Sequence, residues 1–199
     1  MVRYPAEETA EKHERILSEA ARLFRERGLS GVSVGDLMKA ADLTHGAFYN
    51  HFESKQALVA DCIDRVREDA AELIEASRPT AAGKRGFVSK YLSLSARDHP
   101  GQVCLMSSLG SDIAREPTAR SAMSRYVRGF IDKLVSHFPW QVAADARRDA
   151  IRMTASLVGG MVLARAVDDD ALSQEILREV IAQYGGGRRR GAPARRTLG

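Results

Sequence analysis

The chain has 199 residues, of which 44% are hydrophobic and 28% are charged, enough for both a sizeable core and a soluble surface. No apolar run approaches the roughly 18 residues of a membrane span, and the first residues do not resemble a signal peptide. With only two cysteines, Cys62 and Cys104, far apart in the chain, we expect the reducing cytoplasm as its compartment and no association with a membrane.

The net positive charge of the chain comes from its last segment. The formal net charge is +4, and it becomes −1 once five arginines are left out. These are Arg188, Arg189, Arg190, Arg195 and Arg196. The basic pI is therefore no argument that the folded body binds nucleic acid.

The first predicted helix begins near Glu11 and ends at Gly28, while residues 1–10 are expected to fray. Its apolar residues recur at helical spacing. They are Ile16, Leu17, Ala20, Ala21, Leu23 and Phe24. We expect this helix to brace the segment that follows.

Residues 33–52 predict two short helices joined by a tight corner. Ser33 is placed to cap the first helix, and Asp42 tolerates the left-handed backbone that a sharp turn often requires. Thr44 is placed to cap the second, His45 to Phe52, in which Phe48 and Phe52 face inward. The remaining side chains face outward. Such a pair of helices with an outward polar face is the geometry of a DNA-reading helix-turn-helix.

The run LTHGAFYNHFESKQAL resembles the DNA-binding signature of the TetR family of bacterial repressors, and most closely its electrophile-responsive NemR-type branch. The resemblance covers about Ile16 to Ile63, with Asp42 where the family commonly has Gly. It implies an all-α fold, with an N-terminal three-helix bundle that reads DNA and a larger C-terminal domain for ligand binding and dimerisation. The predicted domains are residues 1–53 and 54–184, followed by a disordered Arg-rich tail at 185–199.

Residue chemistry assigns roles within the predicted DNA-binding site. Tyr49 and Lys55 suit phosphate contacts, and Gly46 permits close approach to the duplex. The candidates for base edges are His45, Ala47, Asn50 and His51. Ser33 and Thr44 complete the predicted set. The spacing of His45 and His51 is wrong for a metal pair on one helical face, so we expect no metal and no cofactor.

After Phe52, a long helix capped by Ser54 is predicted to run to about Ser77, and PTAAGKRG is interpreted as a connection. Further helices are predicted from Phe87 to Ser95, Val103 to Ala114, Met123 to Phe138 and Ala150 to Val167, with a last one after an Asp cap at 168–170. Gly159 and Gly160 offer small surfaces for close helix approach. The last two helices could pair with their copies as a four-helix bundle.

The aromatic and sulfur-containing residues between Phe87 and Phe138 have two interpretations, plain core and the lining of a ligand cavity. The family resemblance implies the second. The candidates are Phe87, Tyr91, Cys104, Met106, Tyr126 and Phe130. Cys104 follows a Pro-Gly break near a possible helix N-terminus, where a thiol pKa can be lowered, although core packing is the alternative.

The sequence thus predicts a homodimeric, ligand-responsive repressor that binds double-stranded, palindromic operator DNA and is released by a small-molecule inducer. Two alternatives stay open at this point: a helical protein-interaction module and, less favoured, a small-molecule-binding enzyme. Against the enzyme, the chain has no GxSxG elbow, and Ser107 and Ser108 have no recognisable base partner.

Overall fold

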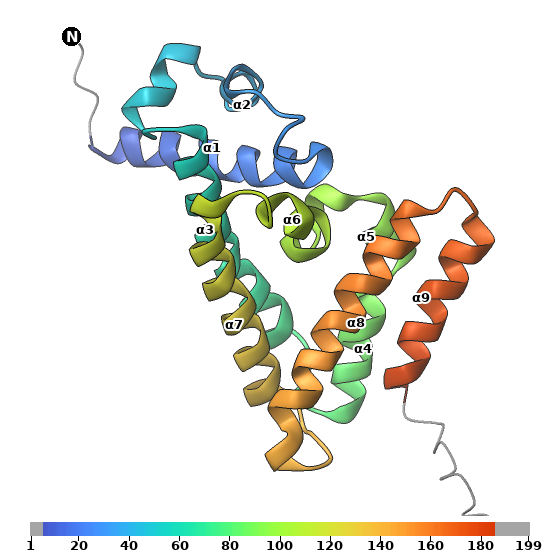
Figure 1. Ribbon diagram of the computed structural model, residues 1–199. Coiled ribbons are helices and arrows are strands. Elements are labelled where there is room, and N and C mark those ends of the chain that lie inside the picture. The colour runs from blue at the N-terminus through green and yellow to red at the C-terminus, as the bar shows by residue number, and fades with distance from the viewer. Residues whose placement is uncertain (1–5, 186–199) are drawn as a thin grey trace, which may run out of the picture.

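The computed structural model describes residues 6–185 and shows an all-α protein (Figure 1). Within that range the chain consists of helices and loops, without a β-strand. None of the described helices is long and apolar enough to cross a membrane. The Arg-rich segment predicted to be disordered lies, from residue 186 onward, outside the described residues.

The N-terminal part is a small bundle built on α1 (Ala6–Arg27). This helix starts five residues before the predicted Glu11, so the prediction of a frayed segment to Ala10 was wrong over residues 6–10. Gly28 ends it with φ of 73°, a left-handed conformation that glycine adopts without strain. The apolar face predicted for α1 is buried, with Ile16 and Ala20 fully inaccessible.

Helix α2 (Val34–Ala40) begins with the predicted cap. The Ser33 side chain accepts from the Asp36 N–H, and the Asp36 carboxylate accepts from the Ser33 N–H, which forms a capping box. At the corner, Asp42 has φ of 55°, as its tolerance of left-handed backbone predicted. Leu43 follows, half-buried against the core.

The second predicted helix is shorter and tighter than expected. Residues His45–Asn50 form a 3₁₀ helix, η1, rather than an α-helix to Phe52. Thr44 occupies the predicted cap position with extended backbone, but its side chain makes no capping hydrogen bond. Burial of both Phe48 and Phe52 confirms the prediction that these side chains face inward.

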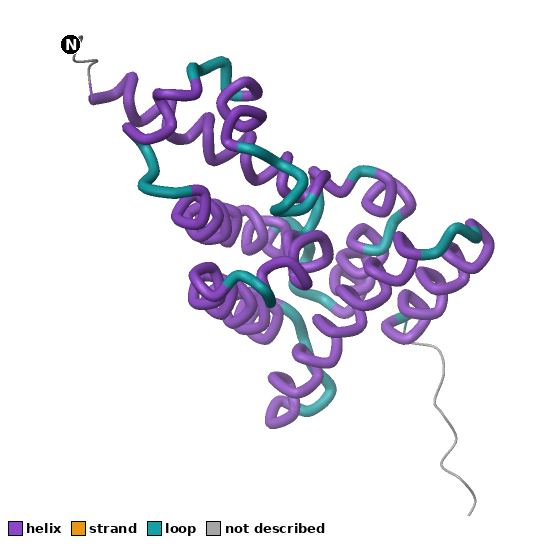
Figure 2. The backbone as a smooth tube through the Cα atoms, turned by 45° about the horizontal axis from the view of Figure 1, so that its top comes forward, coloured by secondary structure: helices purple, strands orange, loops and turns teal. Residues whose placement is uncertain are grey.

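Helix α3 (Lys55–Glu75) then runs away from this bundle, capped by Ser54, whose hydroxyl accepts from the Ala57 N–H at 3.1 Å. It packs along α7 (Arg120–His137), and the two lie side by side in Figures 1 and 2. The remaining elements complete the larger C-terminal part of the chain. They are α4 (Ala81–Tyr91), α5 (Leu94–Asp98), η2 (Pro100–Gln102), α6 (Leu105–Ile113), η3 (Pro117–Ala119), η4 (Ala143–Asp145), α8 (Ala146–Ala166) and α9 (Asp170–Tyr184).

The helix predicted from Phe87 to Ser95 differs from the structure at both ends. Only the first two residues of PTAAGKRG lie outside a helix, because Thr80 accepts from the Gly83 N–H at 3.0 Å and α4 starts at Ala81. The helix predicted to continue to Ser95 ends at Tyr91, and Ser93 caps the separate helix α5. Ser and Thr compete for backbone N–H groups, so each hydroxyl starts a new helix where the apolar pattern alone suggested a break or a continuation.

The buried side chains form one continuous cluster that extends from α1 to α9. It crosses the predicted boundary between residues 53 and 54, where Phe52 and Leu58 are both buried in it. Helix α6 lies below α1, between α3 and α8 (Figure 1). The N-terminal bundle and the rest of the chain are therefore joined by packing as well as by α3.

Candidate DNA interface and ligand pocket

The η1 segment presents a polar and aromatic surface to solvent. We call this the η1 surface, and it consists of five exposed residues: Thr44, His45, Gly46, Tyr49 and Asn50. Tyr49 is 64% exposed although its ring meets Phe48 edge-on, with centroids 5.2 Å apart. A Cβ built on Gly46 would meet no atom within 4 Å. The buried Phe48 thus anchors η1, and the exposed side chains lie on its solvent side.

The N-terminus of α2 lies next to the η1 surface. A Cβ on Gly35 would lie 3.6 Å from Ser33 Oγ and 3.9 Å from His45 Cδ2, so the start of α2 and the start of η1 are neighbours. Ser33 is exposed, and its hydroxyl donates to Asp36 Oδ2 at 2.5 Å. Its donor is therefore already engaged in the capping box.

Ala47 and His51 differ from the other predicted base-contact residues because both are half-buried. Ala47 packs against the core. The His51 ring lies 5.9 Å from His13 and 6.3 Å from Phe52, between centroids. Burial lowers the pKa of His51, and the nearby His13 and Lys12 lower it further.

Lys55 is turned inward rather than toward the η1 surface. Its Nζ donates to the Leu29 carbonyl at 2.5 Å and lies 5.8 Å from the centre of the Phe24 ring. Burial lowers its pKa. Both contacts join the start of α3 to α1 and the loop after it. The arrangement favours a positioning role over the predicted phosphate contact.

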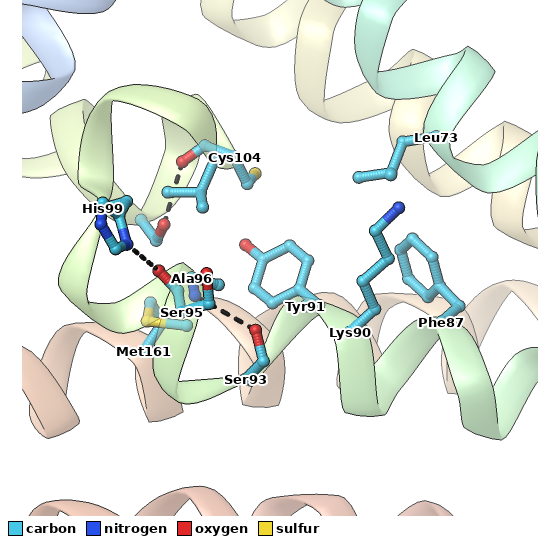
Figure 3. Close-up of a pocket in the computed structure, with 12 residues that line it drawn as sticks. Leu73, Phe87, Lys90, Tyr91, Ser93, Ser95, Ala96, His99, Cys104 and Met161 are labelled. Carbon is cyan, nitrogen blue, oxygen red and sulfur yellow. Dashed lines mark hydrogen bonds between the residues drawn. The ribbon is translucent and has the colours of Figure 1, made fainter.

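A cavity of about 180 Å³ lies between α4 and the segment that leads into α6 (Figure 3). Three of the predicted ligand-site residues line it, namely Phe87, Tyr91 and Cys104. The other lining residues are Leu73, Lys90, Ser93, Ser95, Ala96, His99, Val103, Ser107 and Met161. The spacing pattern did not single these out as one site because they come from five different helices and from the loops and caps between α4 and α6.

The remaining predicted ligand residues lie behind the cavity wall. Phe130 is buried with its ring centroid 6.3 Å from that of Phe87. Tyr126 is also buried, and its Oη lies 3.7 Å from Cys104 Sγ. Met106 is buried in the core and is not one of the residues that line the cavity. These three support the lining rather than form it.

Two hydrogen bonds join the cavity wall and α6 to the N-terminal bundle. Arg25 Nε, on α1, donates to the Gly101 carbonyl at 2.8 Å, within the segment between His99 and Cys104. The Leu29 N–H donates to Asp112 Oδ2, on α6, also at 2.8 Å. The backbone next to the cavity therefore contacts the bundle that carries the η1 surface.

Helix α8 exposes a row of small and apolar residues at helical spacing, which we call the α8 stripe. Its members are the exposed Ile151, Ala155, Val162 and Ala166 and the half-buried Gly159. Ile151 and Val162 are 46% and 44% exposed. A Cβ on Gly159 would meet no atom within 4 Å, whereas one on Gly160 would lie 3.1 Å from Val180 Cγ2 of α9. Of the two glycines predicted for close helix approach, only Gly160 makes one, and it does so within this chain.

The described residues contain no group of three or more His, Cys, Asp or Glu side chains that could hold a metal ion. The two histidines of the rejected metal pair differ in burial, with His45 exposed and His51 half-buried.

Comparison with known proteins identifies the segment that carries the η1 surface. Residues 16–62 match the family described as "Bacterial regulatory proteins, tetR family". The HTH-type transcriptional regulator AcrR of Shigella flexneri is 37% identical over 73 residues, which are 37% of this chain and 34% of AcrR. The HTH-type transcriptional repressor NemR of Escherichia coli K12 is 24% identical over 59% of this chain and 62% of NemR. The chain thus spans less than two thirds of either relative in these matches.

Solved structures share the fold over a longer range. A TetR-family regulator from Agrobacterium tumefaciens has a TM-score of 0.71 at 23% identity, covering 87% of this chain and 97% of that one. The reduced form of E. coli NemR has a TM-score of 0.66 at 21% identity, covering 87% and 95%. Residues 16–62 thus match the tetR family of bacterial regulatory proteins, and the chain shares the fold of these solved structures.

Proposed function

We propose that the protein is a transcriptional repressor that binds a palindromic operator as a homodimer and releases it when a small molecule occupies the cavity. The observation that carries the proposal is the η1 surface, which is exposed, rigidly anchored and part of the matched helix-turn-helix segment. A solvated row of donors and aromatic groups at the end of a helix-turn-helix is suited to the major groove. The sign of regulation comes from relatives such as NemR, which is named a repressor.

Within this proposal, Tyr49 contacts phosphate, Gly46 allows the backbone close to the duplex, and His45 and Asn50 reach base edges. Ala47 and His51 contribute their exposed parts at the border of the surface. Lys55 acts indirectly, because its hydrogen bond to Leu29 holds α3 against the bundle. Thr44 and Ser33 are exposed at the cap positions of η1 and α2.

We place the dimer interface on the α8 stripe together with the exposed Leu163 and Leu172. A two-fold interface brings the same patch of both subunits together, and a smooth stripe with Gly159 at its centre lets two helices approach closely. One 3₁₀ segment reads few bases, so useful specificity requires two such surfaces on one operator.

Release follows from a shift between two arrangements of the dimer. A ligand in the cavity displaces the segment between His99 and Cys104, whose Gly101 carbonyl accepts from Arg25 of α1. The N-terminal bundle moves with that contact, and the two η1 surfaces of the dimer no longer fit adjacent major grooves.

The test is selection of bound duplexes from a random pool with the full chain. We expect a two-fold-symmetric sequence and binding that weakens steeply with salt, since phosphate contacts release counterions. No retention on any duplex, combined with capture of a helical partner protein, would favour the interaction module. Turnover of a small molecule without DNA would favour the enzyme.

A further inference from the structure

We propose that the cavity takes a one- or two-ring aromatic molecule with a carbonyl or carboxylate oxygen, which accepts a hydrogen bond from the Tyr91 hydroxyl. The inference rests on the proposed function, because it names the chemical class of the inducer. It depends on the size of the cavity, on an unpartnered hydroxyl within it and on the charges around it.

The size of the cavity limits the ligand to a compact molecule. The cavity measures about 180 Å³, and an engineered apolar cavity of about 150 Å³ in another protein is known to hold benzene. Phe87, Leu73 and Met161 supply apolar walls from three helices. Figure 3 shows Phe87 and Leu73 at the end of the cavity away from Cys104. An aromatic ring fits these walls better than a flexible or strongly polar molecule does.

Tyr91 provides the hydrogen-bonding group. The residue is only 7% exposed, and its hydroxyl is buried without a hydrogen-bond partner. Figure 3 shows this hydroxyl turned toward Cys104 and away from Phe87. The Cys104 thiol and the Ser107 hydroxyl lie beside the Tyr91 hydroxyl, but neither has hydrogen-bond geometry to it, and Ser107 already donates to the Cys104 carbonyl at 2.9 Å. The Tyr91 hydroxyl is therefore available to donate a hydrogen bond to a ligand oxygen. Such a bond would remove the free-energy cost of a buried, unpaired hydroxyl.

The charges around the cavity disfavour an organic cation. Lys90 and His99 line it, and none of the lining residues that the structure describes carries a carboxylate. Arg165 lies near enough to interact electrostatically with Tyr91, and Arg25 does so with Tyr126. Arg165 Nη2 donates to the Ala96 carbonyl at 2.7 Å, and this hydrogen bond holds the guanidinium beside the residues that line the cavity. The surrounding cations favour an electron-rich oxygen and repel an ammonium group.

The experiment is calorimetric titration of the full chain, without DNA, with four probes of similar shape: acetophenone, benzoate, cumene and benzylammonium. We expect acetophenone, benzoate or both to bind at least several-fold tighter than cumene, and benzylammonium to bind weakest. The affinities for acetophenone and benzoate show whether the cavity prefers a carbonyl or a carboxylate oxygen. Binding of benzylammonium as tight as that of acetophenone and benzoate would overturn the proposed class.

A pair of matched variants tests the role of the hydroxyl. Tyr91→Phe should weaken the probe with the acceptor oxygen by about 3- to 10-fold, the range of one net hydrogen bond, and leave cumene unchanged. Tyr184→Phe is the control, because its hydroxyl is also buried without a partner but does not line the cavity. Equal affinities for wild type and Tyr91→Phe would overturn the assignment to Tyr91.

The two proposals can fail separately. If the wild-type chain selects an operator but binds none of the probes, the ligand class is wrong while the DNA-binding function stands. If it binds the acceptor probes in the expected order but selects no duplex, the cavity assignment stands and the repressor function fails.

Discussion

At the scale of single residues, the η1 surface depends on side chains that it does not expose. Phe48 is fully buried, Phe52 stacks on His13 with ring centroids 4.6 Å apart, and Asp42 turns the chain between α2 and η1. These contacts hold η1 in place, so the side chains on its outer face can be changed without loss of the core. This separation allows substitutions on the outer face to report on DNA alone.

Asn50→Ala should relax the preference for one base pair in each half-site, because an amide can pair with both acceptor and donor of adenine. The expected cost at that position is about 1–3 kcal/mol, with little change in folding since Asn50 is exposed. Competition binding with operators altered at each position measures it. Tyr49→Ala is the contrast, and should weaken all sequences equally and reduce the salt dependence. An unaltered base preference would remove Asn50 from the contact set.

His51 should make folding stability depend on pH. Its pKa in the folded chain is lowered by burial, so below its usual value near 6.5 the unfolded chain binds more protons than the folded one. The stability is present above that pH and is lost as the pH falls through the folded pKa. Thermal unfolding between pH 7.5 and 5 should show a larger loss in wild type than in His51→Gln. Parallel curves for the two proteins would contradict this.

The two thiols should differ in reactivity. Cys62 is buried, its Sγ lies 3.6 Å from the Leu17 carbonyl, and burial raises its pKa far above the usual range. Cys104 is half-buried and lines the cavity, so it should react first. If electrophiles also act as inducers, a quinone should release operator DNA from wild type and Cys62→Ser but not from Cys104→Ser. Equal release from all three would assign Cys104 to packing.

At the scale of elements, the contact between α8 and α9 depends on one position of close approach. Gly160 faces Val180 and Leu92, while its neighbour Gly159 faces open space. The close helix approach predicted for both glycines therefore occurs at Gly160 alone, against α9 of the same chain. A spacing pattern shows that small residues are present but does not show which helix they meet.

Gly160→Leu should therefore lower stability by overpacking this contact, at a cost of about 1–3 kcal/mol. Gly159→Leu should leave the fold of the subunit intact, since its Cβ meets nothing. Denaturant titration of both variants at low protein concentration measures the difference. The opposite order of stabilities would place α9 on the other side of α8.

At the scale of the whole molecule, function depends on two subunits. Val162→Glu on the α8 stripe should place a charge in a desolvated interface, and yield a monomer that keeps its helicity but loses operator affinity. Sedimentation and circular dichroism measure the two effects. Arg178→Glu, on the exposed side of α9, is the control for a change of surface charge.

A Val162→Glu variant that remains as tight a dimer as wild type would move the interface away from the α8 stripe. Loss of helicity in the same variant would instead show that Val162 belongs to the core of the subunit. Arg178→Glu should retain wild-type assembly in either case.

The sequence by itself determined the features that depend on local spacing and composition. The all-α class, the capping roles of Ser33 and Ser54, the left-handed Asp42 and the buried pair Phe48 and Phe52 follow from propensity and periodicity, which act within a few residues. The family was recognisable for the same reason, since its signature lies in one continuous run. Membership of the NemR-type branch stays a prediction.

Only the tertiary structure decided the features that depend on residues far apart in the chain. Lys55 was predicted to reach DNA, yet its amine meets Leu29 across the bundle. The cavity combines residues from Leu73 to Met161, which no local pattern could bring together. The orientations of Gly159 and Gly160 depend on which helix packs against each side of α8. Such contacts follow from long-range packing, in which the choice of neighbour overrides local preference.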